Sequence, residues 1–161
     1  MVQMDVVEFL EVFFAAMTPV GELRFSIPLG IYTLDMPWYQ VLPISIVGNI
    51  IPVLFIIPGL HIAAALLHKY PTFLTRMLDW RTQSLLRMYD RRFAKYGATF
   101  LVVLVAIPLP ITGAWTGSLA AWAFGIPARK AIPFIALGVV IAGVIVTVLT
   151  ITGIKIGDEL T

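Results

Sequence analysis

The sequence contains no cysteine, only two histidines and few charged residues. The lack of cysteine excludes disulfides, thiol catalysis and cysteine-based metal sites. Charged residues make up 12% of the chain, whereas a soluble domain has roughly 25%. Hydrophobic residues make up 60% of the chain. This composition indicates an integral membrane protein, and the length of 161 residues predicts a single membrane domain spanning residues 1–161.

Recognised catalytic and metal-binding patterns are also missing. The sequence has no Ser/His/Asp set, no H-E-x-x-H motif and no carboxylate cluster at a useful spacing. We therefore expect no enzyme activity, no metal and no cofactor. The net charge of +2 comes with a concentration of basic residues in one block between apolar segments. Such a block is typical of membrane topology, so we expect no nucleic-acid partner.

Two long apolar runs are suited to crossing a bilayer. They cover residues 38–67 and 133–154, and a membrane-spanning helix needs about 20 apolar residues. Trp38 and Tyr39 stand at the start of the first run, where aromatic side chains favour the membrane interface. The sequence therefore predicts an all-α fold with two spanning helices.

Each long run is preceded by two shorter apolar segments with a break between them. Segments 6–17 and 27–34 flank the first break, and segments 99–111 and 119–124 flank the second. A 12-residue helix rises only about 18 Å, less than the roughly 30 Å hydrocarbon core. We interpret each pair as a re-entrant helical hairpin, with a two-span hairpin as the alternative. The residues expected to break the hairpins are Pro19, Pro28, Gly30, Pro108, Pro110, Gly113 and Gly117.

The second half of the chain repeats the order of the first. Pro37, Pro43 and Gly48 fall on Pro127, Pro133 and Gly138 at one constant offset. A unit with one re-entrant hairpin and one span crosses the membrane once, and a unit with a two-span hairpin and one span crosses it three times. Either number is odd, so the second unit begins on the side of the membrane opposite to the first. The second copy is therefore inverted, as in many transporters. The predicted repeats cover residues 5–67 and 96–155.

The segment between the repeats, residues 68–95, is rich in arginine and carries apolar residues at helical spacing. This pattern predicts a basic amphipathic helix on the membrane surface, with a connector packed under the bundle as the alternative. Basic segments stay on the cytoplasmic side. We expect this linker in the cytoplasm, both termini on the opposite side, and the protein in the cell (plasma) membrane.

The first break carries the sharpest functional signal. Glu22 and Arg24 stand between prolines and glycines, and an ionisable residue at membrane depth costs several kcal/mol unless it is paired or hydrated. The planar guanidinium of Arg24 matches a carboxylate or a phosphate. Glu22 could pair with Arg24 or take up protons for coupling. The alternative is an ion pair that only holds the hairpin together.

Other polar residues of the apolar segments complete the candidate site. The second break offers hydroxyl groups and glycine-exposed backbone, although close packing of the hairpins is an alternative role for its glycines. Asn49 lies within the first long run, where a helix–helix hydrogen bond is the favoured interpretation. The predicted substrate- or proton-binding residues are Glu22, Arg24, Ser26, Asn49, Thr112, Thr116 and Ser118.

The two breaks, PVGELRFSIPLG from Pro19 and PLPITGAWTG from Pro108, resemble those of the small multi-drug export family, which is related to the DedA, or SNARE-associated, superfamily. This resemblance implies two opposed re-entrant hairpins and membrane transport, and it places the superfamily's acidic residue at Glu22. Superfamily members are linked to proton-dependent transport, polyprenyl-phosphate translocation and lipid scrambling. The second hairpin of the superfamily usually carries arginines, whereas this chain has Ala106 and Ala114 there.

The leading functional hypothesis is a transporter of a small amphipathic or anionic substrate, with Glu22 as a candidate for proton coupling. The first alternative is a flippase or scramblase of lipids or polyprenyl phosphates. The second is a structural or interaction protein without transport activity. The lipid bilayer and a small-molecule or lipid substrate are the expected partners, and the Gly/Ala-rich helix faces would suit a homodimer.

Overall fold

The computed structural model describes residues 5–67, 80, 83, 97–108 and 112–160. All regular structure in these residues is helical, which confirms the all-α prediction. The predicted linker at 68–95 lies outside the described residues apart from Trp80 and Gln83, so it stays a prediction. The elements are α1 (Val6–Met17), α2 (Glu22–Pro28), the π-helical segment η1 (Leu29–Thr33), α3 (Trp38–Leu67), α5 (Thr99–Ala106), α6 (Ala114–Ala123) and α7 (Ala128–Leu160).

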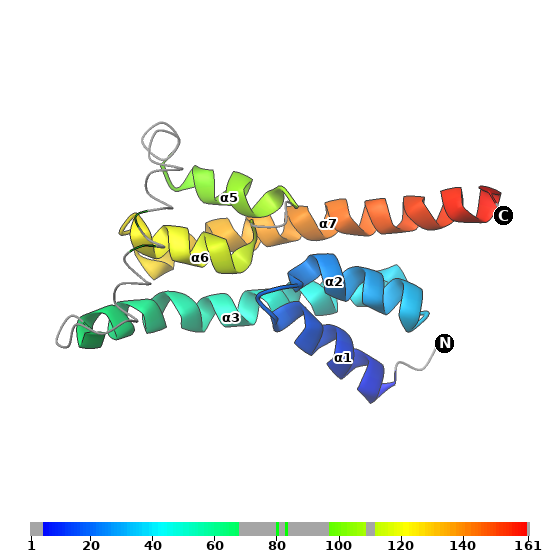
Figure 1. Ribbon diagram of the computed structural model, residues 1–161, viewed down its shortest axis with the longest axis horizontal. Helices are drawn as coiled ribbons and strands as arrows, with labels where there is room; N and C mark the ends of the chain where they lie inside the picture. The colour runs from blue at the N-terminus through cyan, green and yellow to red at the C-terminus, as the bar shows by residue number, and fades with distance from the viewer. Residues whose placement is uncertain (1–4, 68–79, 81–82, 84–96, 109–111, 161) are drawn as a thin grey trace.

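Helices α3 and α7 are the two long elements, and they run in opposite directions along the molecule (Figure 1). Their segments Trp38–Leu60 and Ala128–Gly153 are long and apolar enough to cross a membrane. At 1.5 Å per residue, 23 and 26 residues rise about 34 and 39 Å, which exceeds the hydrocarbon core. The two predicted spans are therefore present as continuous helices.

The short helices form two hairpins whose turns lie in the middle of the molecule (Figure 1). Helix α1 runs inward and α2 runs back toward the same end, whereas α5 and α6 do the same from the opposite end. We call the turn at residues 18–21 the first tip, and residues 107, 108, 112 and 113, which are the described residues between α5 and α6, the second tip. Thr18 ends α1 in an extended conformation, and Pro19 follows because proline cannot continue the helix. The predicted break at this point is confirmed.

Two other predicted breaks are wrong. Pro28 lies inside α2 and Gly30 lies inside η1, so the chain remains helical through both residues. Proline removes one backbone donor, and the π-helical segment that follows uses wider hydrogen bonds, such as Leu34 N–H to the Leu29 carbonyl at 3.2 Å. This change of register lets the helical path continue past the proline.

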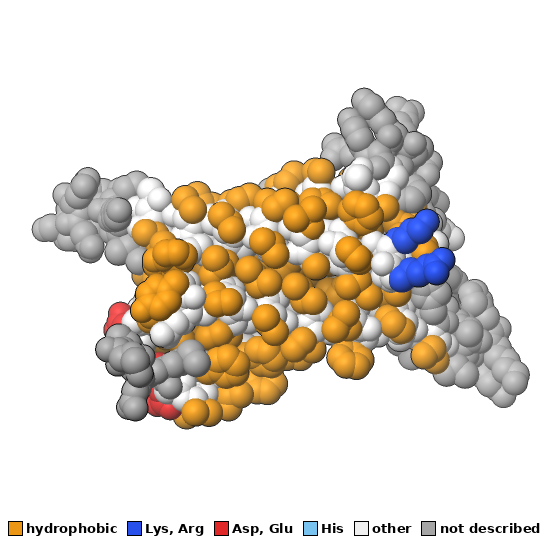
Figure 2. All heavy atoms as spheres, turned by 180° about the vertical axis from the view of Figure 1, so that it is seen from behind, with side chains coloured by type: hydrophobic (Ala, Val, Ile, Leu, Met, Phe, Trp, Pro, Cys, Tyr) orange, Lys and Arg blue, Asp and Glu red, His pale blue; other side chains and the backbone are white. Residues whose placement is uncertain are grey.

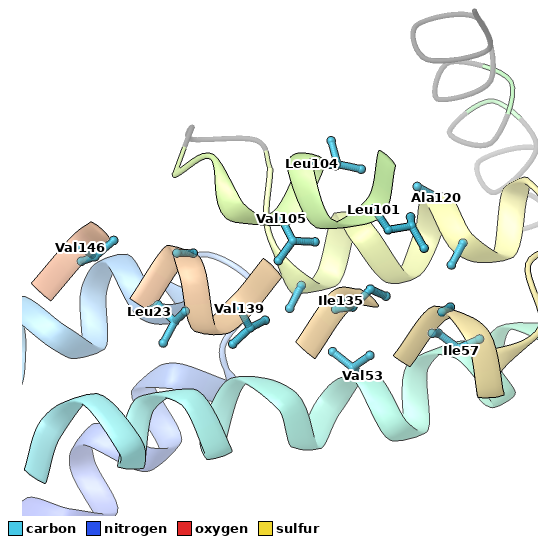
Figure 3. Packing of buried hydrophobic residues seen from close by; sticks show 14 of the residues in the cluster. Leu23, Val53, Ile57, Leu101, Leu104, Val105, Ala120, Ile135, Val139 and Val146 are labelled. Carbon is cyan, nitrogen blue, oxygen red and sulfur yellow. The ribbon is translucent and has the colours of Figure 1, made fainter. Parts of the chain in front are cut away.

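The buried core joins the two halves of the chain. Leu23 of α2, Val105 of α5 and Val139 of α7 belong to one cluster, and Figure 3 shows side chains of both halves between the long helices. Two glycines allow close helix contacts. A Cβ on Gly48 would lie 2.6 Å from the Phe13 carbonyl oxygen of α1, and one on Gly138 would lie 2.7 Å from Val105 Cβ of α5. The first helix of each hairpin, α1 or α5, thus packs against a glycine of the long helix that follows in the same half of the chain.

The surface separates charged ends from an apolar middle. Figure 2 shows hydrophobic side chains over the body of the molecule, with Lys and Arg at one end and Asp and Glu at the other. The basic residues there are Arg129 and Lys130, both exposed at the start of α7. Large apolar side chains such as Val144, which is 47% exposed, face outward along the spanning part of α7. An apolar surface of this extent suits contact with lipid.

Candidate functional site: the contact between the hairpin tips

Glu22 connects the two tips. It is the first residue of α2 and is only 8% exposed. Its Oε2 accepts the backbone N–H of Ala114 at 3.2 Å, and its Oε1 accepts that of Trp115 at 3.1 Å. These are the first two residues of α6, whose own N-cap, Gly113, provides no side-chain bond. Glu22 therefore caps α6 from the other half of the chain, and its negative charge suits the positive end of the helix dipole.

The backbone at this contact fits Glu22 closely. A Cβ on Gly113 would overlap the Glu22 carboxylate, so only glycine leaves room for it. Glu22 itself has a φ of +50°, a left-handed conformation that costs a non-glycine residue roughly 1–2 kcal/mol. Strain of this kind persists where the surrounding contacts determine the conformation. The contact between Glu22 and α6 is therefore a specific feature of this fold.

A further hydrogen bond holds the tips together. The indole Nε1–H of Trp115 donates to the Met17 carbonyl oxygen at 3.3 Å. Met17 is the last residue of α1, and carbonyl groups at the C-terminus of a helix have no partner within that helix. The start of α6 is thus bound both to the start of α2 and to the end of α1.

Arg24 lies near Glu22 without pairing with it. Of the roles left open for Glu22, direct pairing with Arg24 is not seen: the two interact through their charges, but no ion pair or hydrogen bond joins them among the described residues. Both residues belong to the first turn of α2, and residues two apart on a helix do not face each other. Arg24 is half-buried and lines a cavity of about 600 Å³. The other described residues of this cavity are Thr18, Pro19, Val20, Gly21 and Phe25.

Helices α2 and α3 share a row of buried polar side chains, Glu22, Ser26, Ser45 and Asn49, which we call the polar seam. Ser26 Oγ donates to Ser45 Oγ at 2.9 Å. One turn before Ser26 on α2 stands Glu22, and one turn after Ser45 on α3 stands Asn49. Because the two helices are antiparallel (Figure 1), this register places Asn49 opposite Glu22, and the two side chains interact.

Asn49 has an unusual environment. It is fully buried, yet neither its Nδ2 nor its Oδ1 has a hydrogen-bond partner in the part of the chain that the structure describes. Its interaction across the helices is with Glu22 of α2, so the helix–helix hydrogen bond expected for Asn49 stays a prediction. A buried amide without partners costs roughly 1–3 kcal/mol, so its presence calls for an explanation.

The second tip contributes backbone groups more than side chains. Thr112 donates its hydroxyl to the Ile107 carbonyl at 2.7 Å, and Ser118 donates to the Ala114 carbonyl at 2.7 Å. Thr116 and Ser118 belong to α6, so the loop predicted over 112–118 extends only to Gly113. Gly117 is no break either. It lies within α6, where a Cβ would meet Val105 Cγ2 at 2.6 Å.

The remaining predicted residues of the second tip are placed as follows. Pro108 directly follows Ile107, the C-cap of α5, and Pro110 lies outside the described residues. One contributor to the site, Ser45, is absent from the predicted set. The spacing of Ser45 and Asn49, four residues apart within an apolar run, is a signal that could have identified it. Backbone groups of the second break were expected at the site, but the sequence did not show that Glu22 binds them.

The described residues hold no group of three side chains suited to a metal ion. Two helices long and apolar enough to span a bilayer and an apolar surface between charged ends are features of an all-helical membrane protein. Residues 22–145 match the family described as "Putative small multi-drug export protein", and the chain belongs to this family. The description indicates a transporter-like role rather than an enzyme. No curated protein and no solved structure matches the chain.

Proposed function

We propose that this protein transports a small amphipathic anion across the membrane, with Arg24 as the binding group. The observation that carries this proposal is the cavity beside Arg24, a half-buried guanidinium that no ion pair or hydrogen bond holds among the described residues. Arginine stays charged under any physiological condition and binds oxyanions through its planar fork. Val20 and Phe25 supply apolar walls. One charged group in an otherwise apolar cavity favours a ligand with one anionic end and one apolar end.

The arrangement of the helices supports an inverted repeat. Each half has the order short helix, tip, short helix, long helix, and the two tips approach from opposite ends (Figure 1). Gly48 and Gly138 each receive the first helix of their own hairpin. We propose that both hairpins are re-entrant, so that the tips meet near the middle of the bilayer, where transporters of this plan bind substrate.

The Glu22 contact is then the element that transport must rearrange. Substrate cannot pass between tips that are joined through Glu22, Ala114 and Trp115. Protonation of Glu22 would remove the charge that binds the α6 N-terminus, so proton uptake provides a way to release the contact. We propose this as the basis of proton coupling.

The charged ends support one orientation in the membrane. Arg129 and Lys130 lie at the end opposite the acidic residues (Figure 2), and basic residues favour the cytoplasmic side. We propose a plasma-membrane protein with the start of α7 and the 68–95 linker in the cytoplasm.

The test is uptake by proteoliposomes of a naphthalene sulfonate, whose negative charge does not titrate, with a naphthyl trimethylammonium ion as the cationic counterpart. The expected result is protein-dependent uptake of the sulfonate alone. Arg24→Gln should reduce uptake at least tenfold because it removes the charge at the cavity. Arg129→Gln, an exposed basic residue outside the cavity, is the matched control and should retain uptake. Equal uptake by all three proteins would contradict the proposal.

A lipid flippase or scramblase is the second candidate, because the cavity wall is open to the surroundings at Val20, which is 94% exposed. Translocation of a fluorescent anionic phospholipid in the same vesicles separates the two functions. Lipid movement that depends on Arg24, without sulfonate uptake, would favour the flippase. If neither probe moves in any protein, the tip contact has a structural role only.

A further inference from the structure

Trp115 binds both ends of the loop that lines the cavity. The described lining of the cavity begins at Thr18 and passes through the first tip to Phe25. The residue before this loop, Met17, accepts the indole N–H of Trp115 at 3.3 Å, and the residue after it, Glu22, accepts the backbone N–H of Trp115 at 3.1 Å. Trp115 itself is not among the described residues that line the cavity. One residue of the second half of the chain thus fixes both ends of a loop in the first half.

The first tip has few other contacts that could fix its shape. Residues 18–20 are exposed, so they bury little apolar surface. The hydrogen bonds that the structure describes for this loop stay within the first hairpin. Thr18 donates its hydroxyl to the Ala15 carbonyl at 2.8 Å, and the Thr18 carbonyl accepts the Glu22 N–H at 3.3 Å. A segment with few buried contacts opens at little cost, so the shape of the loop depends on where its two ends are held.

We propose that Trp115 is a positioning residue for the anion site, because it holds the first tip in the shape in which Arg24 can bind an anion. This inference rests on the proposed transport function and assigns a further residue to the same site. The cavity and both bonds of Trp115 occur together in this structure, so these bonds favour the form of the tip that contains the cavity. A loop that is already held in its binding shape loses less freedom when the ligand binds, which raises affinity.

The same bonds connect the anion site with α6. Coupling between two sites is reciprocal. If the bonds of Trp115 favour anion binding at Arg24, a bound anion in turn strengthens the hold of Trp115 on the first tip. The substrate therefore stabilises the contact between the two hairpins while it occupies the cavity.

Two replacements of Trp115 isolate its side chain. Trp115→Phe removes the indole N–H but keeps the backbone N–H that Glu22 accepts. Replacement of Trp115 by 3-benzothienylalanine keeps the shape of the indole with a sulfur atom in place of the N–H, in case the smaller ring of phenylalanine disturbs folding. Trp122→Phe makes the same change about two turns further along α6 and is the matched control.

The test measures equilibrium binding of the naphthalene sulfonate to the whole protein in nanodiscs, with Arg24→Gln defining the binding that occurs outside the site. Both Trp115 variants should weaken the Arg24-dependent binding about threefold to tenfold, the ratio that corresponds to one net hydrogen bond. Trp122→Phe should bind like the wild type. In proteoliposomes the loss should appear as a higher KM with an unchanged maximal rate, whereas a fraction of misfolded protein would lower the maximal rate.

Amide hydrogen exchange of the first tip, measured by mass spectrometry, gives a readout that needs no anion. Exchange at Thr18 and Glu22 should be faster in both Trp115 variants, because the ends of the loop are held less firmly, and the sulfonate should slow it in the wild type. Unchanged exchange in both variants would overturn the proposal. If the wild type shows no Arg24-dependent binding, the proposed function fails and this inference fails with it. If the wild type binds and both Trp115 variants bind equally well, only this inference fails.

Discussion

Replacing Glu22 by alanine tests whether one carboxylate holds the two halves of the molecule together. The substitution leaves the buried N–H of Ala114 and the half-buried N–H of Trp115 without their acceptor. Loss of an N-cap costs about 0.5–2 kcal/mol, and each hydrogen bond to a charged group contributes about 1.5–3 kcal/mol. Removing a buried charge and relieving the left-handed backbone at Glu22 recover part of this sum. We expect a net loss of about 2–4 kcal/mol.

The assay is thermal unfolding of the purified protein in detergent. For a chain of this size, each kcal/mol changes Tm by about 2–4 °C, so Glu22→Ala should lower Tm by roughly 5–15 °C. Glu22→Gln keeps one acceptor oxygen, so its Tm should lie between those of Glu22→Ala and the wild type. Glu11→Ala removes an exposed carboxylate of α1 and should change Tm by less than about 2 °C. If Glu22→Ala unfolds at the same temperature as Glu11→Ala, the cap contributes nothing and the reasoning is refuted.

Two further predictions concern packing. Gly113→Ala should destabilise the protein about as much as Glu22→Ala, because its Cβ would overlap the Glu22 carboxylate. Its control is Gly59→Ala in α3, where nothing lies within 4 Å; this change should be neutral or stabilise by up to about 1 kcal/mol. Equal Tm values for the two variants would count against the contact between Glu22 and Gly113. Gly138→Val should separate α5 from α7 and lower Tm by several degrees, since its side chain would meet Val105 Cβ and the Val102 carbonyl oxygen, whereas Val144→Ala on the exposed face of α7 should change Tm by no more than about 2 °C.

The sequence predicted the helices better than it predicted the contacts between them. The end of α1 at Met17 and the whole of α3 follow from Pro19 and from the apolar run that starts at Trp38, because proline and hydrophobic length act locally. The breaks at Pro28 and Gly30 were wrong for a related reason. A proline removes one donor, but the π-helical segment after it supplies different hydrogen bonds, and single-residue preferences do not show such a change.

The candidate site was located in part. Glu22 and Arg24 stand out because charges are rare in this chain, but their partners could not be read from the sequence. Glu22 binds backbone N–H groups of residues more than 90 positions away, and every residue except proline has such a group. The sequence left open whether Arg24 pairs with Glu22, and the answer depends on the helical turn that begins at Glu22, where residues two apart do not face each other.

The central claim is that the hairpin tips meet at a water-accessible site inside the membrane, and cysteine labelling tests it most directly. The chain has no cysteine, so a single Val20→Cys at the first tip can be reacted with a membrane-impermeant maleimide in proteoliposomes. Val47→Cys, on the exposed face of α3 near the middle of its span, is the control for lipid exposure. The account predicts that Cys at position 20 reacts, that excess naphthalene sulfonate protects it, and that Cys at position 47 does not react. No labelling at position 20 would contradict the account.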